Sequence, residues 1–139
     1  MKALSIKQPW ASLIAHGIKD IENRTWKTNF RGRIFIHATA KSVGQMKDIL
    51  TPEQYETVLS SGWKQSTYKP LSAIIGEVDI VDCVINHPSI WAEKSNLGEV
   101  VFRDMKPNYN WVLANPLLYN KPILNVKGKL SFWEPDLNV

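Results

Sequence analysis

The longest β-strand signal in the sequence, residues 73–85, constrains the fold more than any other segment. Its apolar residues are largely β-branched and crowd together, which is typical of a strand buried in a sheet. Gly76 lies inside this run and predicts a bulge or a bend, because glycine weakens a regular strand and lets another backbone approach. The segment therefore predicts a β-rich core that bends, as a small barrel requires.

Several other segments have strand character. Residues 86–100 are predicted to be irregular, with one helical turn after Pro88. The further predicted strands cover residues 3–6, 19–26, 33–38, 111–114 and 122–126.

Only two stretches have helical character. The first helix is predicted to begin at Gln8-Pro9, because proline suits the first helical position, and to end at Gly17. The second lies within residues 42–61, where Thr51-Pro52-Glu53-Gln54 is typical of a helix start with a capping box, and Gly62 ends it.

Strands and helices do not alternate regularly along the chain, which disfavours a doubly wound α/β fold. Five to six strands with few helices predict an α+β protein built on a small, closed or nearly closed β-barrel flanked by helices. No repeat, low-complexity tract or linker-like stretch divides the sequence. Residues 1–139 are therefore expected to form a single domain, long enough to bury a core of its own.

The composition excludes several classes of protein. The single cysteine, Cys83, cannot form an internal disulfide, and the three histidines show no metal-ligand spacing. We therefore expect no metal site and no cofactor. No apolar run approaches the roughly 20 residues of a membrane helix, and the N-terminus does not resemble a signal peptide. These features predict a cytoplasmic protein with no membrane partner.

Positive charge is concentrated in the first third of the chain. Residues 1–47 carry nine Lys or Arg against two acidic residues, a balance of +7, whereas the remaining residues carry eight against eleven, a balance of −3. Such segregation indicates one positive face and an anionic partner. An ordinary solvated surface on a mildly basic protein would explain the same pattern.

The order of several short motifs resembles the ASCH domain family along nearly the whole chain. The first thirty residues carry the most specific part of the resemblance. The motifs are Leu4-Ser5-Ile6-Lys7-Gln8-Pro9-Trp10-Ala11, Gly17-Ile18-Lys19-Asp20-Ile21-Glu22-Asn23-Arg24-Thr25-Trp26, Arg31-Gly32-Arg33, Ile36-His37-Ala38-Thr39-Ala40-Lys41, Ile75-Gly76-Glu77-Val78-Asp79-Ile80-Val81-Asp82-Cys83, Lys121-Pro122-Ile123, Val126-Lys127-Gly128 and Trp133.

The resemblance implies a PUA-like β-barrel flanked by helices, with a cleft between the barrel and the first helix. It also implies binding of RNA or DNA. A short bacterial branch of the family hydrolyses N4-acetylcytidine with a lysine, a threonine three residues later and a distant glutamate. Lys19 matches the lysine, but Glu22 stands where the threonine would be. A carboxylate does not replace a hydroxyl in that chemistry, so the substitution argues against the hydrolase.

The residues of the second motif are the main site candidates. On a strand, Glu22 and Arg24 share one face, where arginine offers a planar fork for phosphate and glutamate accepts hydrogen bonds from a base or a ribose. If the protein is an enzyme, Lys19 and Glu22 are the expected catalytic acid/base groups. The structural alternative is a Glu22–Arg24 ion pair on a solvated strand, which stabilises by roughly 0–1 kcal/mol.

Four further candidates come from the junctions next to these strands. Lys7, Gln8 and Trp10 lie where the first strand turns into the first helix, a place that favours an anion. Gln8 would alternatively cap the helix, and Trp10 would pack in the core. Trp26 shares the face of Arg24 and would stack a base, with core packing as the alternative.

The remaining candidates are basic or polar residues of the barrel. Arg31 and Arg33 flank Gly32 in a turn and would contact phosphates, unless they are simply solvated. His37 is either a cleft residue or a histidine satisfied inside the barrel, and Lys127 and Lys129, beside Gly128, would extend the basic surface. The other tryptophans and the cysteine are expected to be structural: Trp63, Trp91, Trp111, Trp133 and Cys83.

Two classes of function stay open at this stage. The first is a binding module that holds RNA, single-stranded DNA or a nucleotide-like small molecule. A long open groove that carries charge at both ends would favour this class. The second is a small hydrolase acting on a modified nucleoside or nucleotide. A deep, closed pocket for one base and a lowered pKa at Lys19 would favour this class. A protein-interaction adaptor would need an exposed apolar patch, which the sequence pattern does not reveal.

Overall fold

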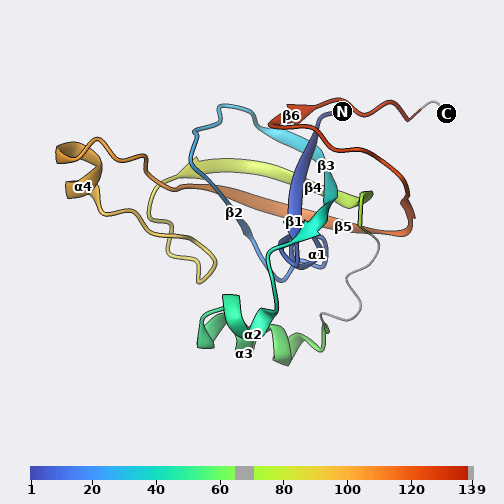
Figure 1. Ribbon diagram of the computed structural model, residues 1–139, viewed down its shortest axis with the longest axis horizontal. Helices are drawn as coiled ribbons and strands as arrows, with labels where there is room; N and C mark the ends of the chain where they lie inside the picture. The colour runs from blue at the N-terminus through green and yellow to red at the C-terminus, as the bar shows by residue number, and fades with distance from the viewer. Residues whose placement is uncertain (65–70, 138–139) are drawn as a thin grey trace.

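A computed structural model describes residues 1–64 and 71–137 of the protein. The elements along the chain are β1 (Ala3–Gln8), α1 (Trp10–Ala15), β2 (Ile21–Arg24), β3 (Gly32–Ser42), α2 (Met46–Ile49), α3 (Pro52–Ser61), β4 (Ala73–Val84), α4 (Leu97–Phe102), β5 (Tyr109–Ile123) and β6 (Phe132–Trp133). In the described residues the strands form one mixed sheet in the order β2-β5-β4-β3-β1-β6 (Figure 1). Only the β1–β3 pair is parallel. The α+β class is thus confirmed.

The sheet is not closed into a barrel, so of the two predicted forms, closed or nearly closed, the closed form is wrong. Strands β2 and β6 form the two ends of the sheet, with no ladder between them in the described residues. Side chains bridge the ends instead. The Arg24 guanidinium on β2 donates a 2.9 Å hydrogen bond to the carbonyl of Ser5 on β1. The Trp26 ring, just after β2, lies 5.8 Å from the ring of Phe132 on β6. Because β6 has two residues and β2 has four, little backbone is available to close the ladder.

Strand β5 joins two segments that the sequence predicts as separate strands. The break between them contains Asn115-Pro116, and the structure makes it a bulge. Ala114 pairs with Asp79 and Leu117 with Glu77, so β5 advances three residues while β4 advances two. Asn115 has a left-handed backbone, with φ of 54°. Proline lacks an N–H, so a strand accommodates it at such an interruption of the ladder.

The helices differ from the sequence pattern in three places. Helix α1 begins at Trp10, with Pro9 as its N-cap, and residues 42–61 contain two helices, α2 and α3. The capping box of α3 is present, with Thr51 and Gln54 each accepting from the other's backbone N–H, and Gly62 ends the helix. Helix α4 begins within residues 86–100, the segment predicted to be irregular, and ends beyond it at Phe102. Its apolar residues Val101 and Phe102 are 71 % and 87 % exposed, so the structure has an apolar surface that the pattern does not reveal. Among the described residues, no helix has the length and apolar character that crossing a membrane requires.

Two clusters of buried side chains hold α1 in place. Ile14 packs with the residues inside the curled sheet, including the fully buried Trp111. Leu13, on another side of the helix, packs with the cluster that includes Trp63 and Trp91. Trp10 contacts both clusters. Trp63, Trp91, Trp111, Trp133 and Cys83, which are expected to be structural, are all buried. Helix α1 is therefore anchored on two sides, which fixes Trp10 beside the sheet.

Gly76 marks a bulge, as the sequence predicts. The pairing register of β4 shifts at this residue against both of its neighbours, β3 and β5. A Cβ atom at Gly76 would lie 2.1 Å from the carbonyl oxygen of Leu117. Since the atom in the way belongs to the backbone, a side chain here cannot be accommodated by a change of rotamer.

We expect Gly76→Ala to lower the free energy of unfolding by about 1–3 kcal/mol, the usual cost of overpacking a core. Gly98→Ala in α4 is the matched control, because its Cβ would meet only the side chain of Asn96. Urea denaturation followed by circular dichroism measures both. Equal stability of the two variants would show that β5 moves away from β4 without cost.

Candidate functional site

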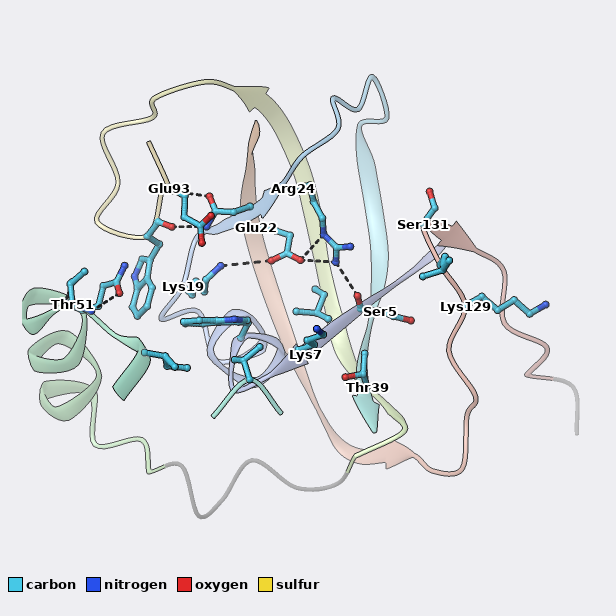
Figure 2. A pocket seen from close by; sticks show the side chains of 18 residues that line it. Ser5, Lys7, Lys19, Glu22, Arg24, Thr39, Thr51, Glu93, Lys129 and Ser131 are labelled. Atoms are coloured by element: carbon cyan, nitrogen blue, oxygen red, sulfur yellow. Dashed lines mark hydrogen bonds and ion pairs between the residues drawn. The ribbon is translucent and has the colours of Figure 1, made fainter. Parts of the chain in front are cut away.

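A cavity of about 540 Å³ opens between the start of the sheet and the helices α1 to α3 (Figure 2). It is lined by five segments that are far apart in the chain. They are residues 5–10, residues 19–24, residues 39–54 in part, the pair Trp91 and Glu93, and residues 129–131. The volume is that of a small-molecule pocket, which typically spans about 300–1,000 Å³.

A buried carboxylate between two cations forms the polar centre of this cavity. Glu22 lies between Lys19 and Arg24 (Figure 2). Its Oε2 accepts hydrogen bonds from Arg24 Nε at 2.9 Å and from Arg24 Nη2 at 2.7 Å. Its Oε1 lies 3.8 Å from Lys19 Nζ. Only 8 % of the Glu22 side chain is exposed. The Glu22–Arg24 pair is therefore not the solvated surface ion pair that the sequence left open as an alternative.

Part of this polar centre is unused by the protein. In the described residues, Glu22 Oε1 accepts no hydrogen bond, since Lys19 Nζ is beyond hydrogen-bond distance. The Nη1 group of Arg24 likewise donates no hydrogen bond there, whereas Nε and Nη2 donate to Glu22 and to the Ser5 carbonyl. Glu22 and Arg24 therefore hold each other in place and still offer one acceptor and one donor group.

Lys19 is the most buried cation of the cavity, with 4 % of its surface exposed. Its ammonium donates a hydrogen bond to the carbonyl of Ile21 and lies 5.3 Å from the ring centroid of Trp10. Burial lowers the pKa of Lys19, and the Glu22 carboxylate partly opposes this effect. A lysine in this environment gives up its proton more readily than a solvated lysine.

Asn23 positions a second aromatic wall. Its amide nitrogen donates to the carbonyl of Trp91 at 3.0 Å, and its side-chain oxygen accepts from the backbone N–H of Glu93 at 3.0 Å. These bonds hold the segment 91–93 against β2, so that Trp91 and Glu93 line the cavity. The sequence pattern does not indicate Asn23 or Glu93 as site residues and assigns Trp91 to packing alone. The alternation of β2 places Asn23 on the face opposite Glu22, which hides this role.

Six of the residues predicted from the sequence come together here. Those that line the cavity are Lys7, Trp10, Lys19, Glu22, Arg24 and Lys129. Lys7 is exposed at the rim, as is Lys129 from the C-terminal segment. The two rim lysines add positive charge beside the buried centre.

Three other predicted site residues do not line the cavity, because neighbouring groups engage them. The Gln8 side chain accepts from the backbone N–H of Ser12 at 2.9 Å, which caps α1 as the alternative interpretation describes. The Trp26 ring packs edge-on against Trp111, with 4.5 Å between the ring centroids. His37 is buried, and its ring nitrogens bond the Ser5 hydroxyl and the Val126 carbonyl.

The remaining three lie elsewhere on the surface. Arg33 pairs with Glu77 at 2.7 Å and with Asp79 at 3.0 Å, so its charge is already neutralised. Arg31 is exposed, bonds nearby backbone carbonyls and lies 3.7 Å from a carboxylate oxygen of Asp82. Lys127 is exposed outside the cavity lining.

Comparisons with known proteins agree on one family. The ASCH domain family profile matches residues 4–123. The chain is 37 % identical over 143 residues to human activating signal cointegrator 1, covering 98 % of this chain and 22 % of that protein. It is 36 % identical over 81 residues to the mouse protein of the same name, covering 58 % of this chain and 14 % of that protein. The chain thus spans about a fifth or less of these relatives.

A solved structure supports the same fold. The crystal structure of ASCH from Zymomonas mobilis superposes with a TM-score of 0.52 at 17 % identity, covering 88 % of this chain and 71 % of that one. At this level of identity the likeness concerns the fold. The resemblance noted in the sequence motifs is confirmed.

The lowered pKa of Lys19 predicts a rise of stability with pH. Between its native pKa and the ordinary value of 10.5, the unfolded chain binds more protons than the native protein at this site. The free energy of unfolding should therefore gain a positive contribution as pH rises through that window. Lys19→Met should remove this contribution, whereas Lys121→Met, at an exposed residue, should keep it. Urea denaturation from pH 7 to 10.5 measures the difference. Parallel curves for the wild type and Lys19→Met would refute the burial effect.

Proposed function

This chain belongs to the ASCH domain family, and from that premise we propose that it is a nucleic-acid-binding module that takes one nucleotide of RNA or single-stranded DNA into the cavity. The family's PUA-like fold is often associated with RNA binding. Binding through a cleft beside the first helix is the expectation that the sequence resemblance raises.

The observation that carries this proposal is the composition of the cavity. A buried polar centre with an unused acceptor and an unused donor lies beside two indole rings, those of Trp10 and Trp91. Polar groups of both kinds read the edge of a base, and aromatic rings bind its face. The rim lysines, Lys7 and Lys129, are available to phosphates.

The size of the cavity supports a single nucleotide as occupant. A volume of about 540 Å³ suits one small molecule and not a run of stacked bases. Helices α2 and α3 and the Trp91 segment border it on one side, as Figure 2 shows for Thr51 and Glu93. A single strand of RNA or DNA would therefore place one unstacked base in the cavity, and the phosphates on either side of that nucleotide would lie at the rim.

We expect Lys7→Ala to weaken binding of a fluorescent single-stranded RNA decamer about three- to tenfold without loss of stability, because Lys7 is exposed. The logarithmic salt dependence of the affinity should also become shallower by about 0.7, the change for one lost phosphate contact.

Lys121→Ala is the control for this test, since Lys121 is exposed and does not line the cavity. Fluorescence anisotropy between 50 and 200 mM salt measures all three proteins. An equal loss of affinity in both variants would mean that binding is spread over the surface and does not use the cavity.

A second candidate function, hydrolysis of a modified nucleoside, is favoured by two specific observations. Lys19 is buried with a lowered pKa, and it shares a compact pocket with Glu22 and Glu93. A lysine with a pKa nearer to neutrality can move a proton at an ordinary pH. Against this candidate, Glu22 replaces the hydroxyl of the hydrolytic branch, and Arg24 already engages one of its oxygens.

We expect little or no turnover of N4-acetylcytidine, because cleavage of its amide needs an activated nucleophile that this pocket lacks at position 22. Release of acetate, followed by chromatography, measures the reaction. Robust turnover that Lys19→Ala abolishes would make the hydrolase the better assignment. Turnover gained by Glu22→Thr would show that this residue alone separates the two functions.

A further inference from the structure

The polar centre of the cavity has a fixed order of donors and acceptors. Lys19 Nζ is a donor, and Glu22 Oε1 is an acceptor 3.8 Å away. Arg24 lies on the other side of the carboxylate (Figure 2), where its Nη1 group is the donor that makes no hydrogen bond among the described residues. Both Arg24 bonds to Glu22 go to Oε2. The carboxylate is therefore not free to turn and accept with both oxygens. One acceptor remains, and a cation lies on each side of it.

Glu22 Oε1 can accept a hydrogen bond from a ligand donor. The side chain is 92 % buried, and the oxygen accepts no hydrogen bond among the described residues. Glu22 Oε1 keeps an ion-pair contact with Lys19 and is accessible from the cavity, so a ligand N–H that reaches it gains a charge-assisted hydrogen bond. Lys19 and Arg24, the donors next to Glu22, favour a ligand that carries a hydrogen-bond acceptor on each side of that N–H.

We infer that the cavity selects the imide edge of a uracil- or thymine-type base, with its N3–H donating to Glu22 and its two carbonyl oxygens facing Lys19 and Arg24. This inference rests on the proposed function and names the base that it would take. The imide edge presents acceptor, donor, acceptor in that order, which is the complement of donor, acceptor, donor in the cavity.

The other bases leave at least one group of this centre unmatched. Cytosine presents a ring nitrogen acceptor at the middle of its edge, which faces the Glu22 oxygen as a like partner. Guanine presents two adjacent donors for one free acceptor, because Arg24 occupies Oε2. Adenine has one donor beside one acceptor and leaves the third group without a partner. Each mismatched base would displace water from a polar atom of the cavity without replacing its hydrogen bond, which is the basis of strong discrimination.

Ligand-side probes test the inference on the wild-type protein. RNA pentamers of uridine, cytidine and adenosine, and a uridine pentamer whose bases carry a methyl group on N3, are titrated by fluorescence anisotropy. We expect the uridine pentamer to bind about tenfold more tightly than the others, the discrimination typical of a matched set of base-edge hydrogen bonds. The N3-methyl pentamer keeps the phosphates and the ring but lacks the donor. Equal affinity for it and for unmodified uridine would overturn the inference.

A variant supplies the complementary test. In Glu22→Gln the amide oxygen is expected to stay with Arg24, so the amide nitrogen would replace the acceptor with a donor. The preference should then shift from uridine towards cytidine, whose middle group is an acceptor. Thermal unfolding checks that the variant is folded, and the ligand series above decides the question even if it is not. A folded variant that keeps the uridine preference would contradict the assigned role of Glu22.

Different results would refute the proposed nucleic-acid binding and the inferred preference for an imide edge. A mixed-sequence RNA decamer serves as the reference ligand for binding as such. If the decamer and all four pentamers fail to bind, the proposed function fails and the inference with it. If the decamer binds and the pentamers bind equally, the proposed function stands and the imide preference is refuted.

Discussion

The pairing of the buried Glu22 carboxylate with Lys19 and Arg24 is the interaction on which the rest of this structure depends. Taking a carboxylate out of water is costly unless cations and hydrogen bonds compensate it, and here Lys19 and Arg24 do so from either side. Because Arg24 also bonds the carbonyl of Ser5, the same arrangement ties the first strand of the sheet order to β1. One charged cluster thus ties β2 to β1 and forms the polar centre of the cavity.

This double role explains why the sheet curls without becoming a closed barrel. The gap between its ends is spanned by an arginine and by aromatic rings after β2, and not by a backbone ladder. A ladder would place strand backbone where the guanidinium now lies and would remove the polar centre. The open seam in the sheet therefore lies beside the polar centre of the cavity, and the rings of Trp26, Trp111 and Phe132 pack against one another there.

Much of the fold could be predicted from the sequence, since its signals are local. The capping box at Thr51, the glycine bulge at Gly76 and the crowding of β-branched residues in β4 act over a few residues, and the structure contains all three. The merging of two predicted strands into β5 could not be foreseen. Asn115-Pro116 is as typical of a turn as of a bulge, and only the paired strand β4 decides between them.

The sequence by itself determined the family and the α+β class from short motifs and local patterns. It also indicated the pair Glu22 and Arg24 from the alternation of one strand, and Lys19 from the resemblance to the family. Only the tertiary structure decided which cations remain available. Arg33 looks the same as Arg24 in sequence, yet acidic residues more than forty positions away neutralise it. Burial and charge pairing depend on segments distant in the chain, and so does the wall of Trp91 and Glu93 that completes the cavity.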